Sequence, residues 1–455
     1  MTPDTIAALA TATGGGVGIV RISGPRAEDI LRALCPSLPR NLPTHKLVLT
    51  EARTHELLDE ILAVVMRAPR SYTGEDVAEL HGHGGAANLQ RLLDAALAAG
   101  ARLATPGEFT RRAFVAGKLD LTQAEAVQAL IGARDVRTLR AAHALRSGAL
   151  GREVEQARRE VVDQLAEIEG ALEFPDEADD RESPGSRTAR LRGLAASLAA
   201  RAAHFCRPLG VVPEVMLVGA VNAGKSSLLN ALCGRERALV DAEPGTTRDV
   251  VEAEVELGPR AGLVRIVDTA GLRSKTSELE RRGHAMANDR RRSASVTVLV
   301  YDGHVGFGEK DEALRALLAC EGPVLVVANK SDLPSTKGHA GALSVSARTG
   351  AGLDALRQHL SDVLAVGDEE LVVASTRQAE ALRIAAAAIA RGADALAPAV
   401  ADVVADAVEG TREPSAPEVT AVELRRALGA LGQLTGETVD EEVLDALFAR
   451  FCIGK

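Results

Sequence analysis

Runs of hydrophobic residues mark an N-terminal region that combines strands with a helix. Short β-type runs lie at residues 17–22 and 62–66 among glycine-rich turns, and an apolar segment of helical period follows at 89–97. Strands, turns and a helix in this order predict an α+β domain that ends near residue 118.

A helical region is predicted next. From residue 119 to about 208 turn residues become rarer, and Ala, Leu, Glu and Arg recur at helical spacing. Pro175 and Pro184 interrupt this pattern and predict one loop. Helical composition returns from about residue 371 to 449, with a less ordered insert expected near 409–417.

Between these two helical parts the pattern is that of an α/β domain. From residue 211 to about 367, β-type runs alternate with helical segments. The clearest runs lie at 215–218, 263–267, 296–300 and 324–327. This alternation predicts a mostly parallel sheet covered by helices, inserted into one helical domain.

A further strand is predicted at 251–257, where apolar and acidic residues alternate. Its sequence, VEAEVEL, places Glu252, Glu254 and Glu256 on one side of the strand. We expect that side to face the solvent.

Length and composition fit a globular protein of about three domains. The chain has 455 residues, and at about 150 residues per domain each part can bury a core. Aromatic residues make up only 2% and Trp is absent, so Ala, Leu, Val and Ile must build the cores. This disfavours a generic binder of single-stranded nucleic acid, because such proteins stack bases on aromatic side chains.

Charge and cysteine usage narrow the class further. The formal net charge of -10 indicates no broad basic surface, so any contact with RNA must be local or shared with a partner. The five cysteines form no Cys-x-x-Cys pair, which fits a reducing compartment. No apolar run approaches the roughly 20 residues of a membrane span. We therefore expect a cytoplasmic protein with no membrane association.

A phosphate-binding loop is predicted at residues 219–226. Their sequence, GAVNAGKS, fits the Walker A pattern and stands between a predicted strand and a predicted helix. Backbone N–H groups of such a loop face phosphate oxygens, Lys225 supplies a cation, and the Ser226 hydroxyl can bind Mg²⁺. The predicted nucleotide contacts in this segment are Asn222, Ala223, Gly224, Lys225, Ser226 and Ser227.

Three more segments give the phosphate site a resemblance to the GTPase family. Residues 268–271 (DTAG) end a strand, where the carboxylate can hold the second shell of Mg²⁺ and the Gly N–H can meet the γ-phosphate. Residues 329–332 (NKSD) supply an aspartate that can accept from the donors on one edge of guanine. Residues 346–348 (SAR) resemble the loop behind the base. The predicted contacts are Asp268, Thr269, Ala270, Gly271, Asn329, Lys330, Asp332, Ser346, Ala347 and Arg348.

The switch segment is predicted at residues 245–249, GTTRD. Thr247 is the natural second protein ligand of Mg²⁺ when GTP is bound. Arg248 is an alternative source of positive charge beside the phosphates, as in GTPases that carry an arginine in cis.

The order of these parts resembles the MnmE, or TrmE, family of tRNA modification GTPases. The resemblance rests on residues 14–24 (GGGVGIVRISG), on the central GTP-binding motifs and on the C-terminal sequence FCIGK. Further matching stretches lie at 72–77, 79–85, 105–109, 118–126 and 174–177, so the resemblance covers nearly the whole chain.

The resemblance implies a multidomain fold of α+β and α/β parts. Its parts are an N-terminal α+β domain for folate binding and dimerisation, a discontinuous α-helical domain and an inserted Ras-like α/β P-loop G domain. We expect them at residues 1–118 for the first, 119–210 and 371–455 for the second, and 211–370 for the third.

The resemblance also implies a reaction and partners. Members act as homodimers with the flavoprotein MnmG (GidA), in a heterotetramer or larger complex that holds the tRNA. They add a (carboxymethyl)aminomethyl group at carbon 5 of the wobble uridine, with 5-formyl- or 5,10-methylene-tetrahydrofolate as the one-carbon source. Carried over by motif, the folate contacts are Arg21, Glu79, Lys118 and Lys455. Without the family, each would be an ordinary surface charge.

Potassium dependence is a further implication of the resemblance. K⁺ would take the place of an arginine finger, held by the Asn222 side chain and by backbone carbonyls around Asp241, Glu243 and Thr246. The alternative for Asn222 is a turn residue chosen for its backbone freedom.

Two catalytic residues are implied as well. Leu272 follows the DTAG motif where many GTPases have a water-orienting glutamine, and the resemblance gives that task to Glu280. Otherwise Glu280 belongs to the solvated face of a charged helix. Cys452 is either a nucleophile or acid in the RNA chemistry or an inert apolar cysteine.

Two other functions remain open from the sequence. One is a regulatory switch GTPase in ribosome assembly, and the other is a dimerising GTPase scaffold. Both would have the G domain without the one-carbon chemistry. His81 and His83 can share a strand face, but two imidazoles without a third ligand favour ordinary packing over a metal site.

Overall fold

The contacts of the chain divide it into two compact units. A computed structural model describes residues 4–173, 184–203, 205, 209, 211–234, 251–258, 260–268, 295–320, 322–334, 338–364, 373–396 and 415–454. The first unit contains Met1–Gln128, Ala144–Ala203 and Val373–Lys455, and the second contains Ala129–His143 and His204–Val372.

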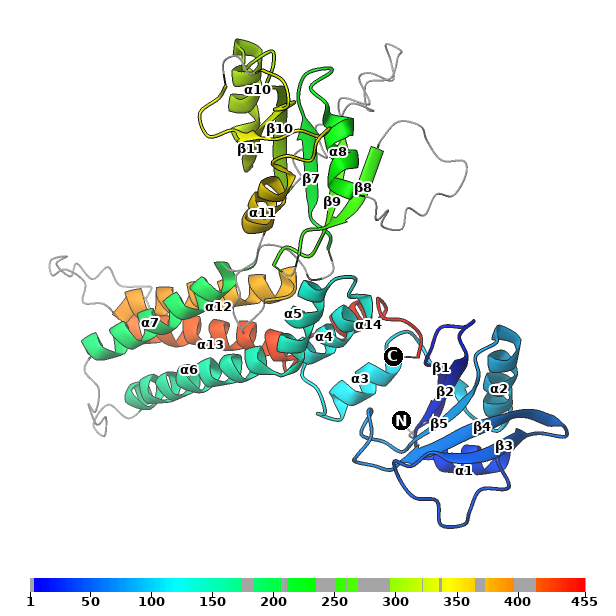
Figure 1. Cartoon of the computed structure of the whole chain (residues 1–455). Helices are drawn as coiled ribbons and strands as arrows, with labels where there is room; N and C mark the ends of the chain where they lie inside the picture. The colour runs from blue at the N-terminus through cyan, green and yellow to red at the C-terminus, as the bar shows by residue number, and fades with distance from the viewer. Residues whose placement is uncertain are drawn as a thin grey trace, which may run out of the picture. The chain divides into compact units, whose positions relative to one another are not determined.

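A six-stranded sheet opens the first unit (Figure 1). Its order is β3-β4-β5-β2-β1-β6, antiparallel except for the parallel pair β1 and β6. The strands are β1 (Ile6–Leu9), β2 (Val17–Ser23), β3 (Val48–Arg53), β4 (Leu57–Met66), β5 (Val77–His83) and β6 (Arg102–Leu103). Helices α1 (Ala27–Leu34) and α2 (Ala86–Ala98) cover one face, where Ile22, Leu80 and Leu89 share the core. The opposite face carries Arg21 and Glu79.

An ionic cluster joins α3 (Glu108–Val115) to this sheet. Arg112 lies 3.0 Å from Glu108, 2.6 Å from Asp4 and 3.1 Å from Glu75. Glu75 in turn accepts a hydrogen bond of 2.9 Å from Ser23 Oγ on β2. The cluster therefore fixes the loop between β4 and β5 against the sheet.

Long helices form the rest of the first unit. The helix α12 (Thr376–Leu396) packs on α7 (Pro184–Ala203) and α13 (Ala416–Thr435), and α13 packs on α6 (Ala149–Glu173) (Figure 1). Buried alanines such as Ala385 and Ala388 allow α12 to approach its neighbours closely. The remaining helices are α4 (Leu121–Gly132), α5 (Val136–Arg146) and α14 (Glu441–Phe448), with α4 and α5 continuing across the division between the units.

The start of α13 corrects one boundary. Its first turn contains Pro417, and Ser415 N–H donates a capping hydrogen bond to Glu418 Oε2 at 2.6 Å. Proline suits a first turn because its missing N–H has no partner there. The expected insert at 409–417 is therefore wrong at its last residues, and residues 409–414 lie outside the described part.

A second six-stranded sheet forms the core of the second unit. Its order is β12-β11-β10-β7-β9-β8, with β8 antiparallel and the others parallel. The strands are β7 (Glu214–Val218), β8 (Val251–Glu256), β9 (Leu263–Asp268), β10 (Val296–Asp302), β11 (Val324–Asn329) and β12 (Leu343–Ser344). Helices α8 (Lys225–Cys233) and α11 (Leu353–Leu364) share its core, while α10 (Glu309–Ala319) contacts β10 and β11. The predicted mostly parallel sheet is confirmed.

The prediction for β8 is wrong at Glu254. Glu252 and Glu256 are exposed as expected, but the Glu254 side chain is only 18% exposed. It forms ion pairs with Arg134 at 2.6 Å and with Arg265 at 3.3 Å. Alternation identifies the face on which a side chain lies, but it does not show what packs against that face.

Across the described ranges, no helix has the length and apolar content needed to cross a membrane.

Protonation of Glu108 should weaken the first unit in acid. Burial alone would raise its pKa, but hydrogen bonds from Arg102, Thr105 N–H and Arg112 lower the pKa from 4.5 to about 2. Because the folded pKa is the lower one, this stabilisation is complete above about pH 4.5 and is lost as the pH falls toward 2. We expect Glu108→Gln to lower the free energy of unfolding by about 1–2 kcal/mol at pH 7, and the difference from wild type to shrink in acid.

Thermal unfolding of the full chain between pH 7 and 3.5 measures this effect. Glu56→Gln is the control, because the Glu56 side chain is 58% exposed in its pair with Arg91. Identical pH dependence of wild type and Glu108→Gln would contradict the role of the Glu108 carboxylate.

Candidate functional site

The loop between β7 and α8 has the backbone conformation of a phosphate cradle. Gly224, directly before α8, has φ of +86°, and a Cβ there would lie 2.3 Å from Asn329 Nδ2. Only glycine therefore fits at this close approach. The N-terminus of α8 follows at once, where free backbone N–H groups and the helix dipole attract anions.

Lys225 brings the positive charge of this loop. It is only 6% exposed, and its Nζ donates to the carbonyl oxygens of Gly219 at 3.0 Å and Ala220 at 2.8 Å. The ammonium group thus lies against the loop that the sequence predicts to surround the phosphates.

A pair of oxygen ligands lies beside the loop. Ser226 Oγ donates to Asp268 Oδ2 at 2.5 Å, and Asp268 is the buried last residue of β9. Hydroxyl and carboxylate oxygens are the ligand types that Mg²⁺ prefers. The donor set therefore fits the metal that accompanies nucleotide phosphates.

Asn329 joins the phosphate loop to the loop after β12. Its Nδ2 donates to the carbonyl oxygens of Ala223 at 3.0 Å and Gly224 at 3.3 Å. Its Oδ1 accepts from the backbone N–H of Lys330 at 2.8 Å and of Ala347 at 3.1 Å. The buried carboxamide thus ties together three predicted nucleotide motifs.

Asp332 presents an ionised carboxylate at the predicted base site. A hydrogen bond of 2.6 Å from Ser346 Oγ is the main cause that lowers the Asp332 pKa, and Arg348 lies 2.8 Å away. The carboxylate is therefore available to accept from paired donors such as those of guanine.

The sequence did not indicate a role for Asp302. Its carboxylate, at the last residue of β10, lies 2.7 Å from Lys330 Nζ. This contact helps to hold Lys330, whose backbone φ is +64°. The place of Asp302 at the carboxyl end of a parallel strand was the only signal that could have found it.

The structure describes only some of the residues that are predicted to bind potassium or to form the switch segment. Asn222 has φ of +65° and is exposed. No hydrogen bond of its side chain to a described residue is present. Ser227 is exposed in the first turn of α8. Outside the described residues lie Asp241, Glu243, Thr246, Thr247, Arg248, Thr269, Ala270, Gly271, Glu280 and Lys455.

A second candidate site lies on the open face of the first sheet. Arg21 on β2 and Glu79 on β5 are direct partners across the two strands, and Arg21 Nε donates to Glu79 Oε1 at 2.7 Å. Their side chains are 17% and 11% exposed. Burial would raise the Glu79 pKa, but hydrogen bonds from His81 and Arg21 outweigh it, and the pKa is lowered.

Two aromatic rings flank Arg21. The guanidinium carbon lies 5.7 Å from the Tyr72 ring centroid and 5.8 Å from that of Phe109. Rings at this distance attract a cation. Sequence patterns alone assigned no individual role to Tyr72 or Phe109, although both belong to stretches that carry the family resemblance and aromatic residues are scarce in this chain.

The C-terminal tail lies against the same unit. Gly454 O accepts from Arg21 Nη1 at 3.5 Å, and Cys452 O accepts from Gly107 N–H at 3.5 Å. Cys452 is exposed. Lys118 Nζ donates at 2.9 Å to Pro69 O, in the loop that also holds Tyr72. The structure thus places Arg21 and Glu79 in contact, with the tail beside Arg21 and with Lys118 bound to the loop between β4 and β5.

The two histidines make separate contacts. His81 Nε2 lies 2.8 Å from Glu79 Oε2, and His83 Nδ1 lies 2.7 Å from Asp59 Oδ1. His83 is therefore held to β4, while His81 belongs to the Arg21 and Glu79 cluster.

Comparisons with known proteins agree along the whole chain. The family model of the GTP-binding protein TrmE N-terminus matches residues 5–118, and that of the MnmE helical domain matches residues 121–452. A tRNA modification GTPase MnmE of Synechococcus sp. (strain RCC307) is 39% identical over 467 residues, which cover 99% of this chain and 98% of that protein. The MnmE of Symbiobacterium thermophilum is 41% identical over 478 residues, with both chains covered completely.

Fold, site and comparisons together define a GTP hydrolase of tRNA modification. The chain belongs to the MnmE, or TrmE, family of tRNA modification GTPases. The predicted fold class and the family resemblance are both confirmed.

Asp332 should decide which base the G domain accepts. In Asp332→Asn, guanine loses an ionised acceptor for its ring N–H and amino group, so we expect GTP affinity to fall by about 100-fold, or about 3 kcal/mol. The new amide can donate to the 2-carbonyl of xanthine, so affinity for xanthosine triphosphate should rise. Competition binding with both nucleotides measures the change, and Asp354→Asn, at a fully exposed side chain, is the control. GTP binding as tight as that of wild type would contradict the assignment.

Proposed function

We propose that this GTPase acts with a flavoprotein of the MnmG (GidA) type to modify carbon 5 of the wobble uridine in certain tRNAs. The product is a (carboxymethyl)aminomethyl group whose one-carbon unit comes from a tetrahydrofolate. The observation that supports it is the largely buried pair of Arg21 and Glu79, with two aromatic rings beside Arg21, in the domain that matches the TrmE N-terminus.

The domain roles form part of the proposal. Residues 1–118 bind folate and dimerise, 119–210 and 371–455 form the helical domain, and 211–370 form the G domain. Two copies of the chain and the flavoprotein make a heterotetramer or larger complex in the cytoplasm, and tRNA binds to that complex. The net charge of -10 supports a shared RNA surface rather than one on this chain alone.

In the proposed hydrolysis each nucleotide contact has one task. Lys225 and the N-terminus of α8 hold the phosphates, Ser226 and Thr247 would bind Mg²⁺ with Asp268 behind them, and Asp332 reads guanine. Mg²⁺ supplies positive charge to the phosphate oxygens. Glu280 would accept a hydrogen bond from the attacking water and so orient it.

Potassium completes the proposed G site. A K⁺ ion held beside the phosphates loses part of its water shell, so several protein oxygens must replace those waters as ligands. The exposed Asn222 side chain supplies one such oxygen in the phosphate loop, and carbonyls near Asp241, Glu243 and Thr246 would supply others. The ion contributes positive charge that the chain would otherwise need an arginine to provide.

Arg21, Glu79, His81, Tyr72 and Phe109 form a cluster, called the Arg21 cluster below. This cluster and the nearby lysines suit the two ends of a folate. A pterin edge offers N–H donors that Glu79 can accept, while the carboxylates of the glutamate tail suit cations such as Lys118 and Lys455. Tyr72, which is partly exposed, offers a flat ring beside Arg21, whereas Phe109 is fully buried. A folate there would bring its one-carbon unit to the tail, where Cys452 is exposed and serves as nucleophile or acid.

Hydrolysis should depend on the monovalent cation. At equal ionic strength we expect GTP turnover about tenfold or more faster in KCl than in NaCl. Asn222→Ala should remove most of this difference, and Asn230→Ala, on the exposed side of α8, should keep it. Glu280→Ala should be slow in both salts. Equal rates of wild type in KCl and NaCl would exclude the potassium site, and a wild-type rate in Glu280→Ala would exclude the water-orienting role.

Folate binding should require the Arg21 and Glu79 pair. Titration of the full chain with 5-formyl-tetrahydrofolate should give saturable binding, and Glu79→Gln should weaken it by about tenfold or more, because an ionised acceptor for the pterin is lost. Glu51→Gln, whose side chain is 48% exposed on the same sheet, should bind as wild type does. Wild-type affinity in Glu79→Gln would contradict the site.

A further inference from the structure

Within the second unit, an ion pair fastens the start of α5 to the strands of the G domain. Arg134 Nη2 lies 2.6 Å from Glu254 Oε2, and its Nη1 donates to Glu254 Oε1 at 3.2 Å. The two parallel contacts form a bidentate pair, which fixes orientation as well as distance. Arg265, the residue opposite Glu254 on β9, contacts the same carboxylate at 3.3 Å.

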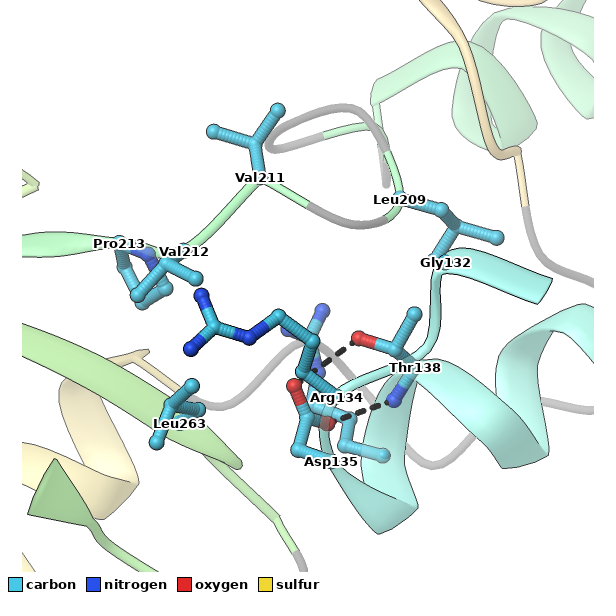
Figure 2. Close-up of a pocket in the computed structure, with 10 residues that line it drawn as sticks. Gly132, Arg134, Asp135, Thr138, Leu209, Val211, Val212, Pro213 and Leu263 are labelled. Atoms are coloured by element: carbon cyan, nitrogen blue, oxygen red, sulfur yellow. Dashed lines mark hydrogen bonds between the residues drawn. The ribbon is translucent and has the colours of Figure 1, made fainter. Parts of the chain in front are cut away.

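A second contact holds the same helix end. Asp135 caps α5 by accepting from Thr138 N–H at 2.8 Å and from Thr138 Oγ1 at 3.1 Å (Figure 2). Gly262, in the turn between β8 and β9, has φ of +71°, and a Cβ there would lie 2.6 Å from Asp135 Oδ1. The turn therefore closes directly on the cap of α5.

A pocket lies beside these contacts. The pocket is lined by Arg134, by Thr138 of α5 and by the apolar residues Leu209, Val212, Pro213 and Leu263 (Figure 2). Arg134 keeps 57% of its side chain exposed, whereas Glu254 keeps only 18%. Water thus reaches the cation from one side, so the pair can open without unfolding the strands.

The strands lead from this pair to the Mg²⁺ edge of the nucleotide site. β8 and β9 pair in register from Glu254 opposite Arg265 to Val251 opposite Asp268. Asp268 is the residue that accepts from Ser226 Oγ. Three steps along one hairpin therefore separate the ion pair from Asp268, which contacts the predicted Mg²⁺ ligand Ser226.

Helices α4 and α5 connect the ion pair to the first unit. Ala129–His143 belongs to the second unit, while residues up to Gln128 in α4 and from Ala144 in α5 belong to the first. Two continuous helices thus connect the segment that carries Arg134 to the unit that holds the Arg21 cluster.

We propose that Arg134 and Glu254 couple the nucleotide state of the G domain to helix α5, with Arg134 acting as a positioning residue and not as a catalytic one. A change at Asp268 moves the paired strands, and the ion pair passes this displacement to the helix end. A partly exposed ion pair contributes little to stability, so it can break and re-form during the GTP cycle. The proposal rests on GTP hydrolysis, and it depends neither on the potassium site nor on folate binding.

Hydrogen exchange of the full chain tests the coupling. Amide exchange is compared between the GDP-bound protein and the protein with a non-hydrolysable GTP analogue. In wild type we expect residues 136–143 to change their exchange rate by about threefold or more between the two states. Arg134→Glu and Glu254→Arg should each reduce this difference to less than about 1.5-fold. The double variant, with the charges exchanged, should restore it when it is made in an Arg265→Gln background, so that the exchanged arginine does not face a second cation.

Two further measurements separate coupling from damage. GTP hydrolysis by Arg134→Glu should stay within about twofold of wild type, because no reacting atom is touched. Arg260→Glu, in the same turn and paired with Asp362 at 3.3 Å, should keep the wild-type exchange difference. The proposal is overturned if residues 136–143 do not respond in wild type, if either single variant responds fully, or if the double variant fails to recover. If wild type binds no folate, or hydrolyses GTP equally fast in KCl and NaCl, the proposed function is contradicted. The exchange difference at residues 136–143 is not affected by either outcome.

Discussion

The carboxyl edge of the second sheet is the constraint on which the nucleotide site depends. β7, β9, β10 and β11 run parallel, so each strand ends at this edge and brings its following loop there. Asn329 then ties the loop after β7 to the loop after β12 with one buried carboxamide. Because these two loops are held together without a ligand, little of their conformational entropy remains to be lost when the nucleotide binds.

The first unit meets a different constraint on its open sheet face. A charged pair that is mostly shielded from water is costly unless every charge has partners. Arg21 and Glu79 meet this condition through each other, through His81 and through the two rings. The pair therefore forms a stable polar site beside the C-terminal tail. One chain thus combines a nucleotide site in one unit with a candidate one-carbon site in the other, and α4 and α5 are two of the segments that connect the units covalently.

Local sequence patterns were enough to predict the nucleotide site and the parallel sheet. The GTP-binding motifs are short and contiguous, and the alternation of strands and helices indicated the parallel sheet that aligns them. Pairings between distant residues were not predictable in the same way. Glu254 follows a solvent-facing pattern, yet Arg134, 120 positions away, covers it. Nothing in the sequence indicated that Tyr72 and Phe109 flank Arg21, because periodicity assigns a residue to a face without naming its neighbour.

We propose that GTP hydrolysis by this chain serves wobble-uridine modification. Mass spectrometry of nucleosides from tRNA tests it most directly, in a strain that lacks the gene and in the same strain carrying either the wild-type gene or Lys225→Ala. We predict that the modified wobble nucleoside disappears without the gene, returns with wild type and stays absent with Lys225→Ala, whose phosphate loop lacks its cation. An unchanged nucleoside profile in the strain without the gene would contradict the account.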